Sequence, residues 1–209
     1  MFFTILGFLL VPCDTIPPLI RLRHLLRTKS VAGLSGVAVA QWSVSWWAWA
    51  VYAVLIESLP LLIVSVITAI VETIYLLFTK KAGLLSWRLI LALAIGGVLL
   101  VTVGIGVNPE IIAATVTIVD LLVLYPQIRR AIKETDLSGI SITAWLFDLM
   151  QDFGWIVYGF GIGHPLLAGW SLVSAPSSML ILFFAIRKRR RKENRRDASP
   201  AQSPPVGEQ

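Results

Sequence analysis

Two carboxylates and two aromatic residues recur at helical spacing in an otherwise apolar stretch of the second half of the chain. Asp148, Asp152 and Trp155 are separated by four and three residues, and Tyr158 follows three residues later. Residues at this spacing lie on one face of a helix. An ionised carboxylate that faces lipid is costly, so such side chains normally face a protein interior or a water-filled cavity. They could carry a coupling proton, bind a cationic substrate or pair with nearby arginines.

Carboxylates also interrupt other apolar stretches. Asp120 lies inside one of them and joins Asp148 and Asp152 as a candidate for proton coupling. For Glu72, near the end of another stretch, we favour a structural contact. The sequence contains no nucleotide-binding glycine loop, no metal-ligand cluster and no credible nucleophile–base pair. We therefore expect that the protein is not an enzyme and needs no cofactor or metal.

The segment around these residues is present in two versions. Each version has a proline at the end of an apolar stretch, then a polar loop, then a second apolar stretch with a Trp-Tyr pair. In the first half these parts are Ile16-Pro17-Pro18, the letters SVAGLS from Ser30, and Trp49 with Tyr52. In the second half they are Tyr125-Pro126-Gln127, the letters DLSGIS from Asp136, and Trp155 with Tyr158. The sequence therefore predicts a duplicated helix–loop–helix unit.

The composition places these units in a membrane. The chain has 209 residues, 56% of them hydrophobic and 14% charged, and a mean hydropathy of +0.80. A spanning helix needs roughly 20 predominantly apolar residues. Seven stretches meet that need, near residues 2–20, 37–56, 59–78, 88–107, 110–128, 140–160 and 165–186. The single cysteine, Cys13, excludes an internal disulfide framework, and we expect the first stretch to be a retained helix.

The distribution of basic residues predicts the orientation. All 18 lysines and arginines fall in four segments, Arg21–Lys29, Lys80–Arg88, Arg129–Lys133 and Arg187–Arg196. Every second loop is therefore basic, which the positive-inside rule assigns to the cytoplasm. We expect the N-terminus outside, the C-terminus in the cytoplasm, and the lipid bilayer rather than nucleic acid as the partner of the basic segments.

An odd number of helices also explains how two copies can lie parallel. Three spans reverse the direction of the chain, so one extra span is needed before a second triplet can have the same orientation. The prediction is an all-α membrane protein in a 3+1+3 arrangement. Its parts are a first three-helix repeat (1–80), a linker helix (81–108), a second three-helix repeat (109–187) and a disordered basic cytoplasmic tail (188–209).

These features resemble the SWEET / PQ-loop repeat family of membrane transporters. Tyr125-Pro126-Gln127 is similar to the motif that names the family, and IVETIYLLF from Ile70 is similar to the end of the third helix in SWEET proteins. The resemblance implies substrate-binding roles for Trp49, Trp155, Ser45, Gln151 and Ser65. Ser65 stands where SWEET proteins have a sugar-binding asparagine. It also implies that Pro17, Pro18, Pro126 and Gln127 form hinges.

The resemblance implies an alternating-access carrier that needs no ATP. The leading expectation is a facilitative uniporter of small sugars. The alternatives are a proton-coupled, cystinosin-like transporter of amino acids that uses Asp120, Asp148 or Asp152, and a non-transporting membrane scaffold. The expected partners are a small-molecule substrate (a sugar or amino acid), lipid and, as an option, further copies in a homo-oligomer. The expected location is the plasma membrane of a prokaryotic cell.

Overall fold

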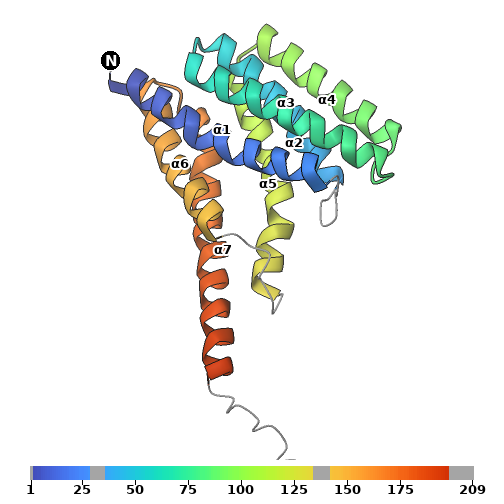
Figure 1. Cartoon of the computed structure of the whole chain (residues 1–209). Helices are drawn as coiled ribbons and strands as arrows, with labels where there is room; N and C mark the ends of the chain where they lie inside the picture. Colours follow the sequence, from blue (N-terminus) through green and yellow to red (C-terminus); the bar gives the residue numbers. More distant parts are fainter. Residues whose placement is uncertain (1, 29–35, 134–141, 198–209) are drawn as a thin grey trace, which may run out of the picture.

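A computed structural model describes residues 2–28, 36–133 and 142–197, and these residues form helices joined by short turns (Figure 1). The helices are α1 (Phe2–Thr28), α2 (Gly36–Leu55), α3 (Leu59–Lys81), α4 (Trp87–Gly106), α5 (Glu110–Lys133), α6 (Ile142–Gly161) and α7 (Pro165–Asp197). None of the described residues lies in a strand. The all-α prediction with seven helices is therefore confirmed over this part of the chain. The loops that begin at Ser30 and Asp136 lie outside the described residues.

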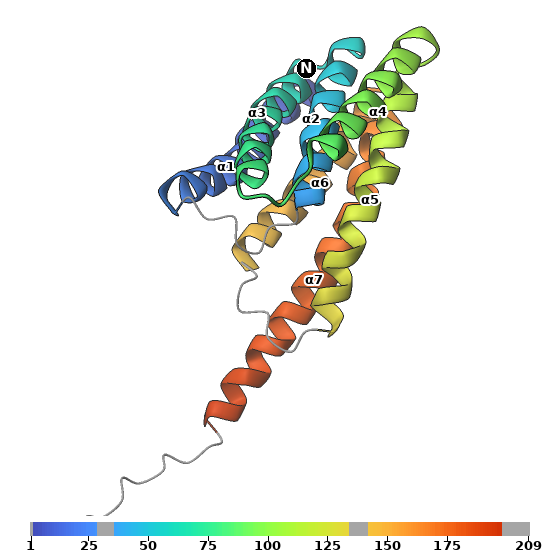
Figure 2. The ribbon, with the colours of Figure 1, turned by 90° about the vertical axis from the view of Figure 1, so that its right-hand side faces the viewer.

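The helices contact one another in two similar groups. In the first group α3 contacts both α1 and α2, and in the second α7 contacts both α5 and α6. The groups meet through α1 against α6 and through α2 against α5 (Figure 1). Helix α4 packs on the outside, against α2 and α5 (Figure 2). If α1–α3 are matched in order with α5–α7, the contact of α1 with α6 corresponds to the contact of α5 with α2.

The two groups also share the same helix-to-helix turn. After α2, the amide of Glu57 donates to the carbonyl of Val54 and the amide of Ser58 donates to that of Ala53. After α6, the amide of Gly163 donates to the carbonyl of Phe160 and the amide of His164 donates to that of Gly159. This is the Schellman pattern, in which the residue after the helix adopts a left-handed conformation. Glu57 has φ +56° and Gly163 has φ +81°. A glycine takes that conformation without strain, whereas a glutamate does not.

Four helices are long and apolar enough to cross a membrane: α1, α3, α4 and α7. Helix α4 is the most exposed of them, and Gly104 is its one buried residue. The exposed side chains of α4 are largely leucine, isoleucine and valine, as expected of a surface that faces lipid. Helices α2, α5 and α6 carry more polar side chains, and each contacts the opposite group, so part of their surface faces protein.

Small residues allow close contact where α1 crosses α6. A Cβ atom added at Gly154 would meet Leu10 at 2.3 Å, and one added at Gly161 would meet Phe3 at 2.1 Å. Helices in membranes rely on such small residues because van der Waals packing, not water exclusion, holds them together. The α1–α6 contact therefore depends on these glycines.

Two helix ends differ from the sequence-based predictions. Helix α1 continues to Thr28 with Pro12, Pro17 and Pro18 inside it, although those prolines suggested an earlier break. Helix α7 continues to Asp197, where a disordered tail was predicted from residue 188 (Figure 1). The Lys- and Arg-rich segment contains good helix formers, and the next proline is Pro200, so nothing ends the helix earlier. Residues 198–209 lie outside the described part.

Candidate functional site

A cavity of about 250 Å³ lies between the two groups of helices. The described residues that line it come from α1, α2, α3, α5, α6 and α7, and none of them comes from α4. The helix that was predicted to be a linker therefore contributes no described side chain to the cavity. Small-molecule sites commonly have volumes of roughly 300–1,000 Å³, so this cavity suits a small solute.

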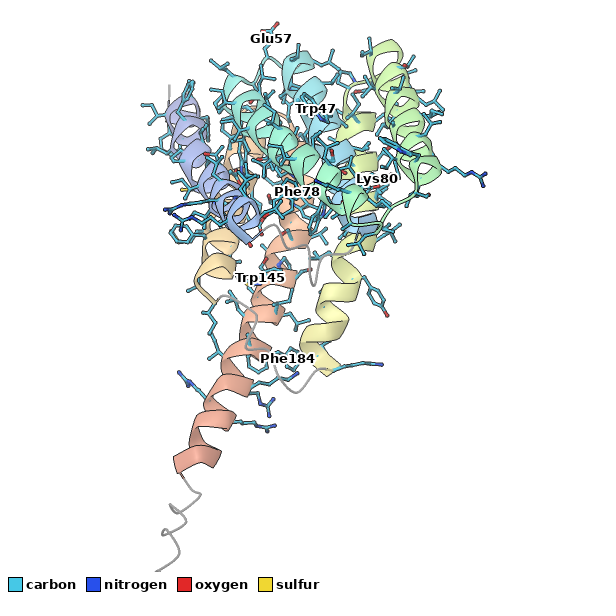
Figure 3. All side chains as sticks on the ribbon, turned by 45° about the vertical axis from the view of Figure 1, so that its right-hand side comes forward. Trp47, Glu57, Phe78, Lys80, Trp145 and Phe184 are labelled. Atoms are coloured by element: carbon cyan, nitrogen blue, oxygen red, sulfur yellow. The ribbon has the colours of Figure 1, made fainter. Side chains whose placement is uncertain are left out.

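Tryptophans form much of the cavity wall. Trp49 on α2 and Trp155 on α6 are both buried and both line the cavity, while their predicted contact with a substrate stays a prediction. Each packs edge-on against the tyrosine three residues later, with ring centroids 5.6 Å apart for Trp49 and Tyr52 and 5.4 Å apart for Trp155 and Tyr158. Four more tryptophans also line it: Trp42, Trp46, Trp145 and Trp170 (Trp145 is labelled in Figure 3). Two similar aromatic pairs thus occupy corresponding places in the two groups.

Carboxylates from four helices reach the same cavity. They are Asp14 on α1, Glu72 on α3, Asp120 on α5, and Asp148 and Asp152 on α6. The sequence had marked Asp120, Asp148 and Asp152, but had given Asp14 no role. Its position inside an apolar stretch was the signal that could have identified it. The described lining residues include no lysine, arginine or histidine.

The contacts of Asp14 join the two groups. The side chain of Asp14 is buried, and the indole Nε1 of Trp155 donates a hydrogen bond to its Oδ2. This bond connects α1 with α6 at the cavity wall. Trp155 therefore has a polar role beside its aromatic one, because its indole N–H satisfies a buried carboxylate oxygen.

Asp120 is held by a short chain of hydrogen bonds from α2. The Ser45 hydroxyl donates to Asp120 Oδ1 over 2.7 Å, and Gln41 Nε2 donates to the Ser45 oxygen over 3.0 Å. Ser45 was predicted to bind substrate directly, but it is not among the described residues that line the cavity. Its hydroxyl is used as both donor and acceptor, which suits a residue that positions Asp120, and a substrate-binding role for it stays a prediction.

Other polar atoms at the cavity have no hydrogen-bond partner among the described residues. These are Asp152 Oδ2, Gln151 Oε1 and Thr68 Oγ1, and all three residues line the cavity. Ser65 Oγ is also buried without a described partner, but Ser65 is not among the lining residues. Buried polar atoms normally have partners. Unsatisfied atoms in residues that line a cavity are therefore candidates for contact with a ligand, once a side-chain rotation exposes them.

The predicted hinge residues are partly described. Pro17 and Pro18 line the cavity from α1. The backbone of Pro126 and Gln127 lies within α5, while their side chains fall outside the described residues. A bending role for these positions stays a prediction.

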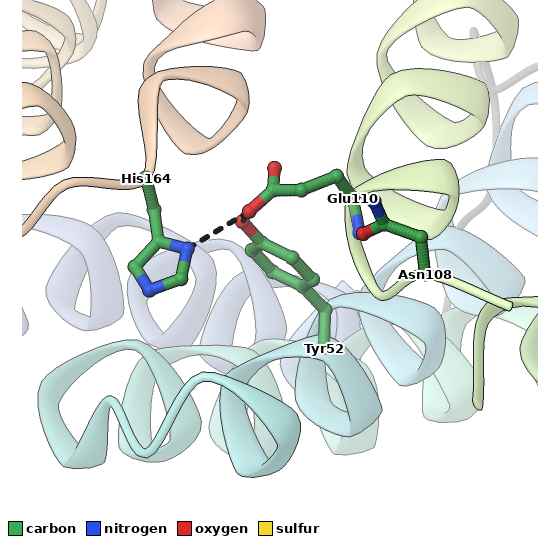
Figure 4. Close-up of polar contacts among 4 residues, drawn as sticks. All are labelled: Tyr52, Asn108, Glu110 and His164. Carbon is green, nitrogen blue, oxygen red and sulfur yellow. Dashed lines mark hydrogen bonds and ion pairs between the residues drawn. The ribbon is translucent and has the colours of Figure 1, made fainter.

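Hydrogen bonds connect the two groups at one end of the bundle, beside the α2–α3 and α6–α7 turns; the cluster around Glu110 is drawn in Figure 4. Glu110 Oε1 accepts from the Tyr52 hydroxyl over 2.9 Å and lies 2.8 Å from His164 Nδ1. The Tyr158 and Ser58 hydroxyls lie 2.8 Å apart, which connects α6 to the start of α3. His164, which the sequence analysis did not select, contacts the glutamate that receives the Tyr52 hydroxyl, so it joins the α6–α7 turn to α5 at this end.

Comparisons with known proteins agree with the fold. No family model and no curated protein matches this sequence. Among solved structures, that of a eukaryotic SWEET transporter is similar, with a TM-score of 0.66. The two chains are 12% identical, and the match covers 91% of this chain and 100% of the other. At this level of identity the comparison shows a SWEET-like fold and leaves the activity to be argued from the site.

Proposed function

We propose that this protein is a membrane carrier that works by alternating access. The observation that carries the proposal is the cavity between the two groups, with polar residues in its lining and hydrogen bonds that connect the groups at the end beside the α2–α3 and α6–α7 turns, which we take as the closed end. A carrier needs a central site that opens to one side at a time, and transporters built from repeats place that site between the repeats. The SWEET-like fold supports this assignment.

The architecture we propose is 3+1+3, with α1–α3 and α5–α7 as parallel repeats and α4 as linker. The corresponding contacts and the shared Schellman turns support a duplication. The exposed apolar surface of α4 and its lack of described lining residues support a linker. The basic segments support an N-terminus outside and a C-terminus in the cytoplasm of the plasma membrane.

The substrate we propose first is a small sugar moved down its gradient. Sugars pack their C–H faces on aromatic rings, and Trp49 and Trp155 line the cavity together with the amide of Gln151. In this account Pro17, Pro18, Pro126 and Gln127 allow α1 and α5 to bend at the open side. No nucleotide is hydrolysed, and the protein is a carrier rather than an enzyme.

A second candidate is proton-coupled export of an amino acid. The observation that favours it is the burial of Asp120 and Asp152 beside the cavity, together with Asp148. A buried carboxyl group near a substrate can exchange a proton with either side as the cavity opens.

Flux through proteoliposomes tests these candidates. Glucose or sucrose counterflow that is unaffected by a pH gradient, and is lost in Trp155→Ala but kept in Trp87→Ala, supports the sugar carrier. Trp87 lies on α4 and is exposed, so it is the matched control. Amino-acid uptake that needs both a proton gradient and Asp152 supports the second candidate. No flux of any solute, with Trp155→Ala harmless in cells, indicates a non-transporting scaffold.

A further inference from the structure

We propose that the ligand of this cavity is a small organic cation, such as a protonated amine or a quaternary ammonium. The proposal rests on the carrier function above and names the class of its substrate. Asp14, Asp120 and Asp152 provide the negative charge, and the tryptophans provide the ring faces.

The first observation is the charge of the cavity. Asp14, Asp120 and Asp152 have exposed fractions of 7%, 6% and 3%, and they come from three different helices. The described donors to them are all neutral: the Trp155 indole to Asp14, the Ser45 hydroxyl and the Gln41 amide to Asp120, and the Ser171 and Ser174 hydroxyls to Asp152. Buried carboxylates need a compensating charge unless they are protonated. A cationic ligand provides this charge when it occupies the cavity.

The second observation is a buried oxygen that lacks a partner. Asp152 Oδ2 makes no hydrogen bond with any described residue, although the side chain is more than nine-tenths buried and lines the cavity. Gln151 precedes Asp152, and its Oε1 atom also has no hydrogen-bond partner among the described residues. The amide oxygen of Gln151 accepts hydrogen bonds only, and so does Asp152 Oδ2 when that carboxyl group is ionised. A ligand that donates N–H groups, or presents a diffuse positive charge, matches this lining.

The third observation is how aromatic and acidic side chains are arranged. On α2, Trp42 and Trp46 lie seven and three residues before Trp49. On α6, Asp148 and Asp152 lie seven and three residues before Trp155. All six side chains belong to residues that line the cavity. The repeat thus places indoles on one helix at the positions where its counterpart has carboxylates. Ring faces attract ammonium groups within about 6 Å. An organic cation can use both kinds of side chain.

A metal ion fits the cavity less well than an organic cation. No three His, Cys, Asp or Glu side chains within the described ranges are close enough to hold a metal ion. The carboxylates are instead spread over the cavity wall. Such a distribution matches a ligand of several atoms whose charge is spread over its methyl or N–H groups.

The test is binding of matched probes to the purified full chain in nanodiscs, measured by calorimetry. Choline is compared with its uncharged isostere 3,3-dimethylbutan-1-ol, ethanolamine with ethanol, and glucosamine with glucose. We expect at least one cation to bind at least about tenfold more tightly than its neutral counterpart, as expected for a buried charge pair. If no cation exceeds its counterpart up to millimolar concentration, the proposal is overturned.

Variants of Asp152, with a control at Glu57, locate the interaction. Asp152→Asn should weaken binding of that cation by at least about tenfold, whereas Glu57→Gln, which removes an exposed carboxylate in the α2–α3 turn, should leave it unchanged. Asp152→Glu should restore most of the affinity. Equal effects of Asp152→Asn and Glu57→Gln would place the cation elsewhere and overturn the proposal. If Asp152→Asn does not fold, Asp120→Asn replaces it with the same expectation.

The result also separates this inference from the carrier function. Cation binding without flux in proteoliposomes keeps the cation site and removes the carrier. Flux of glucose with no preferential binding of any cation keeps the carrier and removes the cation site.

Discussion

The two groups of helices share a framework but differ in the side chains that they bring to the cavity. Helix α2 presents Trp42 and Trp46 where α6 presents Asp148 and Asp152, while Trp49 and Trp155 correspond. The turns that follow both helices have the same hydrogen bonds, although one has Glu57 and the other Gly163 in the left-handed position. The comparison teaches that similar helix contacts and turns can carry different cavity linings, so the two groups would contact a ligand with different side chains.

The largest expected difference is between the two corresponding tryptophans. Trp155→Ala removes a buried aromatic side chain, which costs about 3–5 kcal/mol, and also leaves Asp14 without its indole donor. Trp49→Ala removes only the aromatic packing. Thermal unfolding in nanodiscs should therefore show the larger loss of stability for Trp155→Ala. Equal losses would contradict a structural role for the Trp155–Asp14 bond.

Two buried serines sharpen the comparison at a smaller scale. Ser45→Ala removes the donor to Asp120 and should lower the free energy of unfolding by about 1–3 kcal/mol, because a buried carboxylate oxygen loses its partner. Ser65→Ala removes a hydroxyl that has no described partner and should be neutral or stabilising. The same unfolding assay checks both. A greater loss in Ser65→Ala would refute the assignment of Ser45 as the residue that positions Asp120.

The closed end should depend on one tyrosine from each group. Tyr52→Phe removes the bond to Glu110, and Tyr158→Phe removes the bond to Ser58. Each should destabilise the closed form by about 1 kcal/mol. Thr68 lines the cavity, so Thr68→Cys places a thiol there. A thiol reagent added from the His164 side should label this cysteine faster in both variants. Unchanged labelling would show that these bonds do not control access.

The smallest expected effect concerns the two turns. Glu57→Gly relieves a left-handed conformation that costs about 1–2 kcal/mol for a residue with a Cβ. The added flexibility of glycine in the unfolded chain offsets about 0.5–1 kcal/mol of this gain. A slightly higher unfolding temperature should follow, whereas Gly163→Ala should lower it. Gly106→Ala, at a helical position with open space, is the control and should not lower it.

The sequence predicted the helices better than the contacts between them. Apolar length identified all seven helices because each is set by its own residues. The repeated spacing selected Trp49 and Trp155, and charge in apolar stretches selected Asp120, Asp148 and Asp152. All five line the cavity, while their substrate and proton-coupling roles stay predictions. Continuation of α1 through its prolines was not predicted, since packing against α3 and α6 outweighs the local preference.

Roles that depend on a partner from a distant helix were missed. The sequence did not predict that Ser45 on α2 donates to Asp120 on α5, and its substrate-binding role stays a prediction. Asp14 and His164 acquire their roles only through Trp155 and Glu110, which lie far away in the chain. No local pattern contains that information, because the crossing of the two groups creates it.

Solute counterflow with the closed end chemically locked tests the alternating-access account most directly. Ser58→Cys and Tyr158→Cys, in a Cys13→Ser background, place one thiol on each group at this end. A short bifunctional thiol reagent should abolish counterflow of the solute that the unlocked protein carries, and reduction should restore it, while each single-cysteine variant stays active. Counterflow that persists after complete cross-linking would contradict the account. So would the absence of counterflow of any solute by the unlocked protein.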